Sequence, residues 1–144
     1  MIVKAEEKDI SAVAALAAAL WPHHRAGELE LEFRPLLADP EAAVFLMIEG
    51  DCAVGFAQCQ LRHDYVEGTE TSPVGYLEGI YVAPVYRHRG FAGALLKACE
   101  HWAREMGCTE FASDCELDNP ESLAFHKMLG FTEAGRIICF TKKL

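Results

Sequence analysis

The sequence predicts a single domain of the α/β (α+β) class, in which a mixed, mostly antiparallel sheet is flanked by about four helices. Strand-like and helix-like segments alternate along the chain, and neither a repeat nor a low-complexity linker interrupts them. A length of 144 residues is enough for one domain with one sizeable hydrophobic core. The order of the segments then predicts how the strands are arranged.

The first half of the chain begins with a short strand and continues with two helices. Ile10, Val13 and Leu20 recur at helical spacing, and the helix that they predict stops near Trp21-Pro22. Gly50-Asp51 marks a hairpin between the two strands that follow. The expected elements are a strand at 1–5, helices at 10–20 and 29–37, and strands at 43–48 and 53–61.

In the second half, a strand, a long helix and another strand form a crossover unit. Leu95, Leu96 and Trp102 lie on one apolar face of this helix, and Gly107 ends it. Because such crossovers are right-handed, the two strands should be parallel in an otherwise largely antiparallel sheet. The expected elements are a polar loop at 66–73, strands at 74–82 and 109–113 around a helix at 92–106, a helix at 120–129 and a last strand at 136–142.

The composition indicates which kinds of ligand the protein can bind and in which cellular compartment it is expected. With 22 acidic and 13 basic residues, the net charge is −9, which disfavours nucleic-acid binding and favours cationic small molecules, although acidity also serves solubility alone. No apolar stretch reaches the roughly 18 residues that span a bilayer, and no signal peptide is recognised. The six cysteines lack metal or redox spacing, so we expect buried free thiols, no metal site and a cytoplasmic protein.

The stretch Arg87-His88-Arg89-Gly90-Phe91-Ala92 joins a predicted strand to a helix N-terminus. The first N–H groups of a helix have no intrahelical partner, and the helix dipole adds positive character there. Gly90 lacks a Cβ, so a phosphate can approach the backbone closely. We therefore expect an anion site on the N–H groups from about His88 to Gly93, for a phosphorylated ligand. An ordinary strand-to-helix turn with solvated arginines is the alternative.

Two blocks of the chain resemble the GNAT N-acetyltransferase superfamily. Arg87-x-x-Gly90-x-Ala92 resembles its Arg/Gln-x-x-Gly-x-Gly/Ala acetyl-CoA signature. The second block consists of Asn119-Pro120-Glu121-Ser122, Phe125-His126 and Leu129-Gly130-Phe131. The resemblance implies the GNAT fold, in which the sheet is splayed between two parallel central strands and acetyl-CoA lies in the resulting wedge.

The resemblance narrows to one subgroup of aminoglycoside 6′-N-acetyltransferases, and it runs from Trp21 to the C-terminus. It implies transfer of an acetyl group from acetyl-CoA to the 6′-amine of an aminoglycoside antibiotic, resistance to that antibiotic, and a homodimer. The segments that carry it are Leu20-Trp21-Pro22, Tyr65-Val66-Glu67-Gly68-Thr69, Ser72-Pro73-Val74, Tyr76-Leu77-Glu78-Gly79-Ile80 and Cys108-Thr109-Glu110-Phe111-Ala112-Ser113-Asp114.

The family's acetyl-CoA contacts map onto three parts of the chain. The main chain of Ile80, Tyr81 and Val82 should pair with the pantetheine arm like an added strand. Asn119 matches an asparagine that bonds the pantetheine region, although Asn is also among the best helix N-caps. Gly93 either admits the pyrophosphate or only eases helix packing. The cofactor-binding positions of the signature are Arg87, His88, Arg89, Gly90, Phe91, Ala92 and Gly93.

Acetyl transfer needs a neutral amine nucleophile and a proton for the departing sulfur. Glu78 lies in an apolar run, where a charge needs a partner, and we expect it to hold the ammonium and accept its proton; a solvent-facing strand position is the alternative. Asp114 is the second expected carboxylate. His126 stands where the superfamily commonly has a tyrosine that protonates the thiolate, and histidine can donate a proton near neutral pH. Packing beside CoA or facing solvent is its other possible role.

The resemblance also assigns the acceptor contacts, to Trp21, His24, Tyr65, Glu78 and Asp114. Trp21 after a helix is as often a core residue, and His24 could be half of a solvated pair. Related enzymes often carry an acidic residue just before the final strand, where Gly135 stands here, and Glu133 is the nearest candidate to replace it.

Two other functions stay open on the sequence alone. An acetyltransferase for a polyamine or an amino sugar would share the fold and the CoA signature, and would differ only at the acceptor residues. A non-catalytic acyl-CoA-binding sensor module would bind CoA without turnover.

Overall fold

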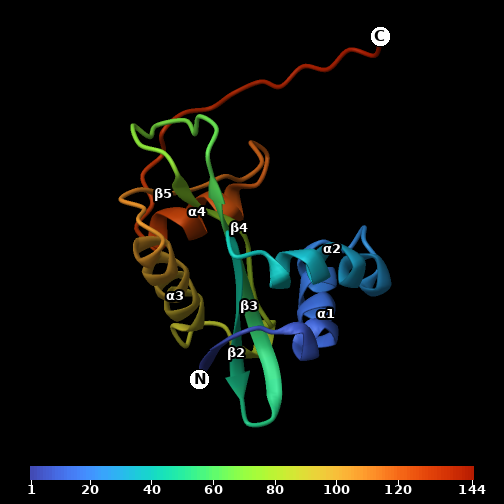
Figure 1. Cartoon of the computed structure of the whole chain (residues 1–144). Coiled ribbons are helices and arrows are strands. Elements are labelled where there is room, and N and C mark those ends of the chain that lie inside the picture. Colours follow the sequence, from blue (N-terminus) through green and yellow to red (C-terminus); the bar gives the residue numbers. More distant parts are fainter.

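The computed structural model describes all 144 residues and shows one sheet with helices on both of its faces (Figure 1). Its elements are β1 (Ile2–Lys4), η1 (Glu7–Asp9), α1 (Ile10–Leu20), α2 (Ala26–Ala38), β2 (Ala42–Glu49), β3 (Cys52–Arg62), β4 (Val74–Val82), η2 (Pro84–Tyr86), α3 (Phe91–Glu105), β5 (Phe111–Ser113) and α4 (Pro120–Met128). The five strands follow the order β1-β2-β3-β4-β5, with antiparallel pairs up to β4 and a parallel pair between β4 and β5. The predicted fold class and the parallel crossover are confirmed.

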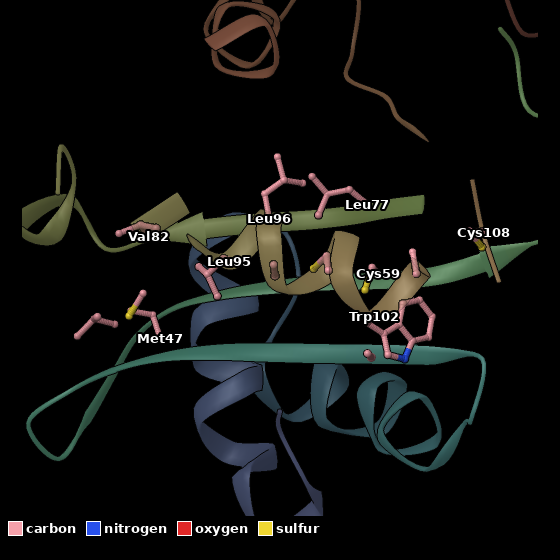
Figure 2. Close-up of a cluster of buried hydrophobic side chains, with 13 residues drawn as sticks. Met47, Cys59, Leu77, Val82, Leu95, Leu96, Trp102 and Cys108 are labelled. Carbon is pink, nitrogen blue, oxygen red and sulfur yellow. The ribbon is translucent and has the colours of Figure 1, made fainter. Parts of the chain in front are cut away.

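The hydrophobic core has two parts, one on each face of the sheet. On one face, α3 buries Leu95 and Cys99 completely, and its apolar residues recur with the period that places them on a single side of the helix. Figure 2 shows Leu95, Leu96 and Trp102 packed towards the strands. On the opposite face, α1 and α2 cover β2 and β3 around Phe56. The sheet is therefore held in place by packed helices on both of its faces.

The pairing between β4 and β5 stops early. Their register joins Gly75 to Phe111, Tyr76 to Ala112 and Leu77 to Ser113, and no further pair forms. Strand β4 nevertheless continues to Val82, paired only with β3. The two parallel strands thus separate at their C-terminal ends, as the resemblance implied, and the strand edge beyond Leu77 has no neighbouring strand.

A β-bulge lies where the two strands separate. Gln58 is opposite Gly79 and Cys59 is opposite Leu77, so Glu78 is an extra residue on β4 with no partner on β3. Bulges bend a strand and change the direction in which a side chain points. The bulge sets Glu78 apart from the strict alternation of the strand.

The predicted last strand at 136–142 is wrong, because residues 131–144 form no helix or strand. The segment leaves the body of the protein (Figure 1), and no other strand of the chain pairs with it. Ile137, Ile138 and Phe140 are 71%, 78% and 87% exposed. A strand forms only where its N–H and C=O groups find a partner, and this segment pairs with no strand of its own chain.

The expectation of buried free thiols is correct for half of the cysteines. Cys59, Cys99 and Cys108 are buried; a hydrogen bond with Cys59 and then burial raise the pKa of the Cys99 thiol, and burial raises the pKa of the Cys108 thiol. Cys52, Cys115 and Cys139 are exposed, because they lie in the β2–β3 hairpin, after β5 and in the C-terminal segment. All six thiols are free, and no helix is long and apolar enough to cross a membrane.

Candidate active site

The turn into α3 presents unpaired backbone N–H groups. Gly90 is the N-cap in a left-handed conformation, with φ of 79°. The N–H of Ala94 donates to the Gly90 carbonyl at 3.0 Å, which leaves the N–H groups of 91–93 ahead of it without an intrahelical acceptor. A Cβ added at Gly90 or Gly93 would meet nothing within 4 Å. Gly93 therefore does not ease packing, and the surface here is open to an anion.

The two arginines of this turn are bound by the protein. Arg87 donates from Nε to the Val82 carbonyl at 2.7 Å, and its guanidinium lies 5.5 Å from the Tyr81 ring centroid. Arg89 reaches the Val85 carbonyl at 3.5 Å. Each arginine thus contacts a carbonyl group of the protein with only part of its guanidinium, and contact of either side chain with CoA stays a prediction.

Asn119 begins α4 as its N-cap. Its side-chain oxygen accepts a hydrogen bond from the Ser122 N–H at 3.1 Å. The capping role considered from the sequence is confirmed. The residue is exposed, so its amide NH₂ group is free for a ligand, and contact with pantetheine stays a prediction.

Glu78 is partnered by Arg62, which lies at the end of β3. Arg62 donates from Nε to Oε1 at 3.0 Å and from Nη2 to Oε1 and Oε2 at 2.9 and 3.0 Å. The Glu78 side chain is only 20% exposed, so the solvent-facing alternative is wrong. The Arg62 guanidinium, which donates to both carboxylate oxygens, is the charged partner that a carboxylate in an apolar run requires. Arg62 was not predicted from the sequence, because no spacing signal connects it to Glu78.

The same arginine reaches the second carboxylate through Tyr76. The Arg62 guanidinium lies 3.5 Å from the Tyr76 ring centroid, and the Tyr76 hydroxyl donates a short hydrogen bond to Asp114 Oδ2. Burial, followed by this hydrogen bond, raises the pKa of Tyr76 well above its ordinary value, so the phenol keeps its proton and stays a donor. We call Arg62, Glu78, Tyr76 and Asp114 the Arg62 network. Tyr76 was also missed as a functional side chain, although it lies two residues before Glu78.

His126 connects α4 to β5. Its Nε2 lies 2.8 Å from the Ser113 hydroxyl, and its Nδ1 lies 2.7 Å from the Ser122 carbonyl. The Ser113 hydroxyl also lies 3.2 Å from the Leu77 carbonyl. His126 is therefore partly buried and does not simply face solvent. Its role as an acid stays a prediction.

Four of the five predicted acceptor residues line two cavities. The larger, about 750 Å³, is lined by Arg62, Tyr65, Asp114 and His126 among others. The smaller, about 220 Å³, includes Trp21 and His24. Glu78 lines neither but is joined to the larger one through Arg62.

Trp21 is both a core residue and a cavity wall. Its ring centroid is 6.4 Å from that of Phe33 and 6.1 Å from that of Phe56. A Cβ added at Gly79 would come within 2.7 Å of Trp21 Cη2, so the absence of a side chain at Gly79 lets the ring lie on β4. The core interpretation of Trp21 is therefore confirmed, and its contact with an acceptor stays a prediction.

The position of Gly135 has another carboxylate beside it. A Cβ added there would lie 3.4 Å from Glu67 Oε1. Glu133, the expected replacement, pairs with Arg136, and this hydrogen bond lowers its pKa. No group of three or more His, Cys, Asp or Glu side chains could hold a metal ion.

Comparisons with known proteins agree with this geometry. Residues 10–131 match the family described as Acetyltransferase (GNAT) family. The aminoglycoside N(6')-acetyltransferase type 1 of Acinetobacter haemolyticus is 45% identical over 125 residues, which are 87% of this chain and 86% of the relative. The protein of the same name from Serratia marcescens is 41% identical over 145 residues, 100% and 99% of the two chains. The solved structure of AAC(6')-Iy in complex with the bisubstrate analog CoA-S-monomethyl-acetylneamine has a TM-score of 0.94 and 35% identity, and the match covers 100% of this chain and 98% of the other.

The open turn leads to a prediction with CoA as the probe. Gly93→Val should fold, since its side chain has free space, but it should block close approach to the N–H groups of 91–93. Loss of about one charge-assisted hydrogen bond, some 1.5–3 kcal/mol, corresponds to a roughly 10- to 100-fold weaker Kd by calorimetry. Gly27→Val is the matched control, because Gly27 also lies in the first turn of a helix with nothing within 4 Å. Equal CoA affinity for both variants would contradict the backbone site.

Proposed function

Because this chain belongs to the acetyltransferase (GNAT) family, we propose that it is an aminoglycoside 6′-N-acetyltransferase that confers resistance by modifying the antibiotic. In this reaction the 6′-nitrogen forms a bond with the acetyl carbon of acetyl-CoA, the carbon–sulfur bond breaks, and the amine loses a proton. The observation that carries the proposal is the pair of carboxylates, Glu78 and Asp114, placed where β4 and β5 separate. A polycationic amine is the acceptor that such a site suits.

The residues on the α3 side suit acetyl-CoA, which supplies the acetyl group as a thioester. The free N–H groups of 91–93 suit its pyrophosphate, and nothing in the protein covers Gly90 or Gly93. The β4 edge at Ile80 and Tyr81 has no neighbouring strand and suits an arm that carries amide groups. The Val82 carbonyl is already occupied by Arg87, so its contribution is the smallest of the three.

Glu78 and Arg62 together favour the neutral, nucleophilic form of the reacting amine. A carboxylate offers about four lone-pair sites, and Arg62 uses two on Oε1 and one on Oε2. The remaining site on Oε2 holds the amine and accepts its proton, directly or through water. The guanidinium is a like charge near that amine and so favours the neutral form that attacks the thioester.

The other acceptor contacts surround this pair. Tyr76 orients Asp114 towards a second ammonium group, and Tyr65, which is 77% exposed, covers the larger cavity. Trp21 gives an aromatic face for a sugar ring, with His24 beside it. Together with the net charge of −9, these residues favour an acceptor that carries several ammonium groups.

His126 is assigned a secondary part in the reaction. Both of its ring nitrogens have partners in the protein, so a proton leaving Nε2 would pass through the Ser113 hydroxyl. A thiolate is a tolerable leaving group, and this route helps the reaction without being essential to it.

The C-terminal segment supports a homodimer. Strand β5 has one neighbour, so its outer edge offers unpaired backbone groups, and the larger cavity lies beside it. The segment exposes Ile137, Ile138 and Phe140, which form an unusual apolar stretch for a free terminus. If the C-terminal segment of a second copy paired with β5, it would both hydrogen-bond the free edge of β5 and bury its own apolar side chains. The copies would work in the cytoplasm, where acetyl-CoA is made and free thiols persist.

The function is tested by a thiol-release assay with kanamycin and its 6′-hydroxyl analogue, followed by mass spectrometry of the products. Kanamycin should gain one acetyl group on the 6′-amine, and the analogue should stay unmodified because the reacting nitrogen is missing. Spermidine and a lysine peptide serve as further acceptors and should react poorly, since neither presents a ring to Trp21. A preference for spermidine, or equal acetylation of both sugars, would contradict the 6′-specific activity.

The dimer is tested by size-exclusion chromatography with light scattering. The full chain should elute with twice its monomer mass, and Ile138→Asp should shift it towards the monomer, because a buried unpaired charge is costly. Leu31→Asp is the control, since Leu31 is 70% exposed on α2, away from β5. A monomeric full chain, or a dimer unaffected by Ile138→Asp, would remove this proposal while leaving the assignment of the activity intact.

A further inference from the structure

The smaller cavity lies against the face of the sheet that α1 and α2 cover. Its walls are largely apolar, from Trp21, Leu29 and Phe33, while His24 and Glu32 are exposed at its rim. At about 220 Å³ it has room for one sugar ring rather than a whole aminoglycoside. Ligand pockets commonly have this composition, with a few polar groups that fix the orientation of the ligand.

Gln58 is the polar group at the floor of this cavity. It is only 7% exposed, and it is the sole buried residue whose side chain ends in an amide or a charged group. Its side-chain amide makes no hydrogen bond within the chain, and no fully enclosed side-chain N or O atom lacks a partner. The amide atoms are therefore not fully enclosed, and Gln58 is one of the residues that line this cavity. A ligand hydroxyl that bonds this amide in place of solvent contributes about 0.5–1.5 kcal/mol to binding.

The register of the sheet places Gln58 close to Glu78, the residue proposed to hold the reacting amine. Gln58 is directly opposite Gly79, the residue that follows Glu78. Directly opposite residues of antiparallel strands have Cα atoms about 4.5–5.5 Å apart. If Glu78 holds the 6′-amine, the sugar ring that carries this amine lies next to Glu78. The hydroxyl group separated from that amine by the fewest bonds is the 4′-hydroxyl.

We propose that Gln58 binds the 4′-hydroxyl of the amine-bearing ring of the acceptor, with Trp21 as the adjoining wall of this subsite. The inference rests on the proposed function and adds to it a residue that selects among acceptors. An amide suits a hydroxyl group because it can donate to the oxygen and accept from its hydrogen. A ring without this hydroxyl leaves the amide unpaired, so the subsite discriminates against deoxygenated antibiotics.

Tobramycin and dibekacin form the matched pair for the test, since they differ only in the 4′-hydroxyl. The wild-type protein should prefer tobramycin in kcat/KM by roughly 3- to 10-fold, the range expected for one neutral hydrogen bond. Gln58→Met keeps the length of the side chain and removes the amide, and it should bring the ratio close to one. Gln60→Met should keep the wild-type ratio, because Gln60 lies on the same strand face but outside the cavity. Kanamycin B against tobramycin, which differ at the 3′-position, should give the same ratio in all three proteins.

The ratio is measured within each protein, so a variant that folds poorly loses activity on both acceptors and still reports its preference. An equal preference for tobramycin in the wild type and in Gln58→Met would overturn the inference, as would no preference in the wild type. If the wild type acetylates neither antibiotic, the proposed function fails instead, and calorimetric titration with the same pair still measures the contribution of Gln58. An affinity ratio that Gln58→Met leaves unchanged in that titration would overturn the inference as well.

Discussion

The site depends on the point at which β4 and β5 stop pairing. Three residue pairs hold the strands together, and beyond Leu77 the edge of β4 faces no other strand. That separation frees main-chain groups for a ligand, places Asp114 at the end of β5, and leaves the N-terminus of α3 open at the end of the same crossover. A sheet paired along the full length of β4 would cover those main-chain groups. The core of α3 packed on the sheet keeps the separated strands in place (Figure 2).

The Arg62 network joins the three strands that meet at this point. Arg62 comes from β3, Glu78 and Tyr76 from β4, and Asp114 follows β5. A carboxylate in a partly apolar site is costly alone, and the guanidinium makes its burial possible. The bulge at Glu78 explains how a strand residue reaches both its arginine and the separated edge. The same residues therefore join the three strands and carry the charges of the proposed site.

The sequence alone predicts the local elements of the fold, but not the features of the site that depend on pairing between strands. The period of Leu95, Leu96 and Trp102 and the Gly90 turn determine local structure, so α3 and its open N-terminus were predicted correctly. The bulge at Glu78 depends on register between strands, which short-range patterns do not encode, and Arg62 and Gln58 acquire their roles only through that pairing. The segment at 136–142 has the composition of a strand but no partner in its own chain. The contacts of the predicted acetyl-CoA and acceptor residues with their ligands stay predictions.

The central claim is that Glu78, placed by the bulge and held by Arg62, prepares the amine for attack. Glu78→Gln preserves the shape of the side chain and removes its charge. Steady-state turnover with saturating kanamycin, measured beside calorimetric titration of CoA, tests the claim most directly. We predict that kcat falls by roughly 10²-fold or more, the usual loss for a general base, while CoA affinity is unchanged. Near-normal turnover at saturating acceptor would contradict the account and would move the base to Asp114.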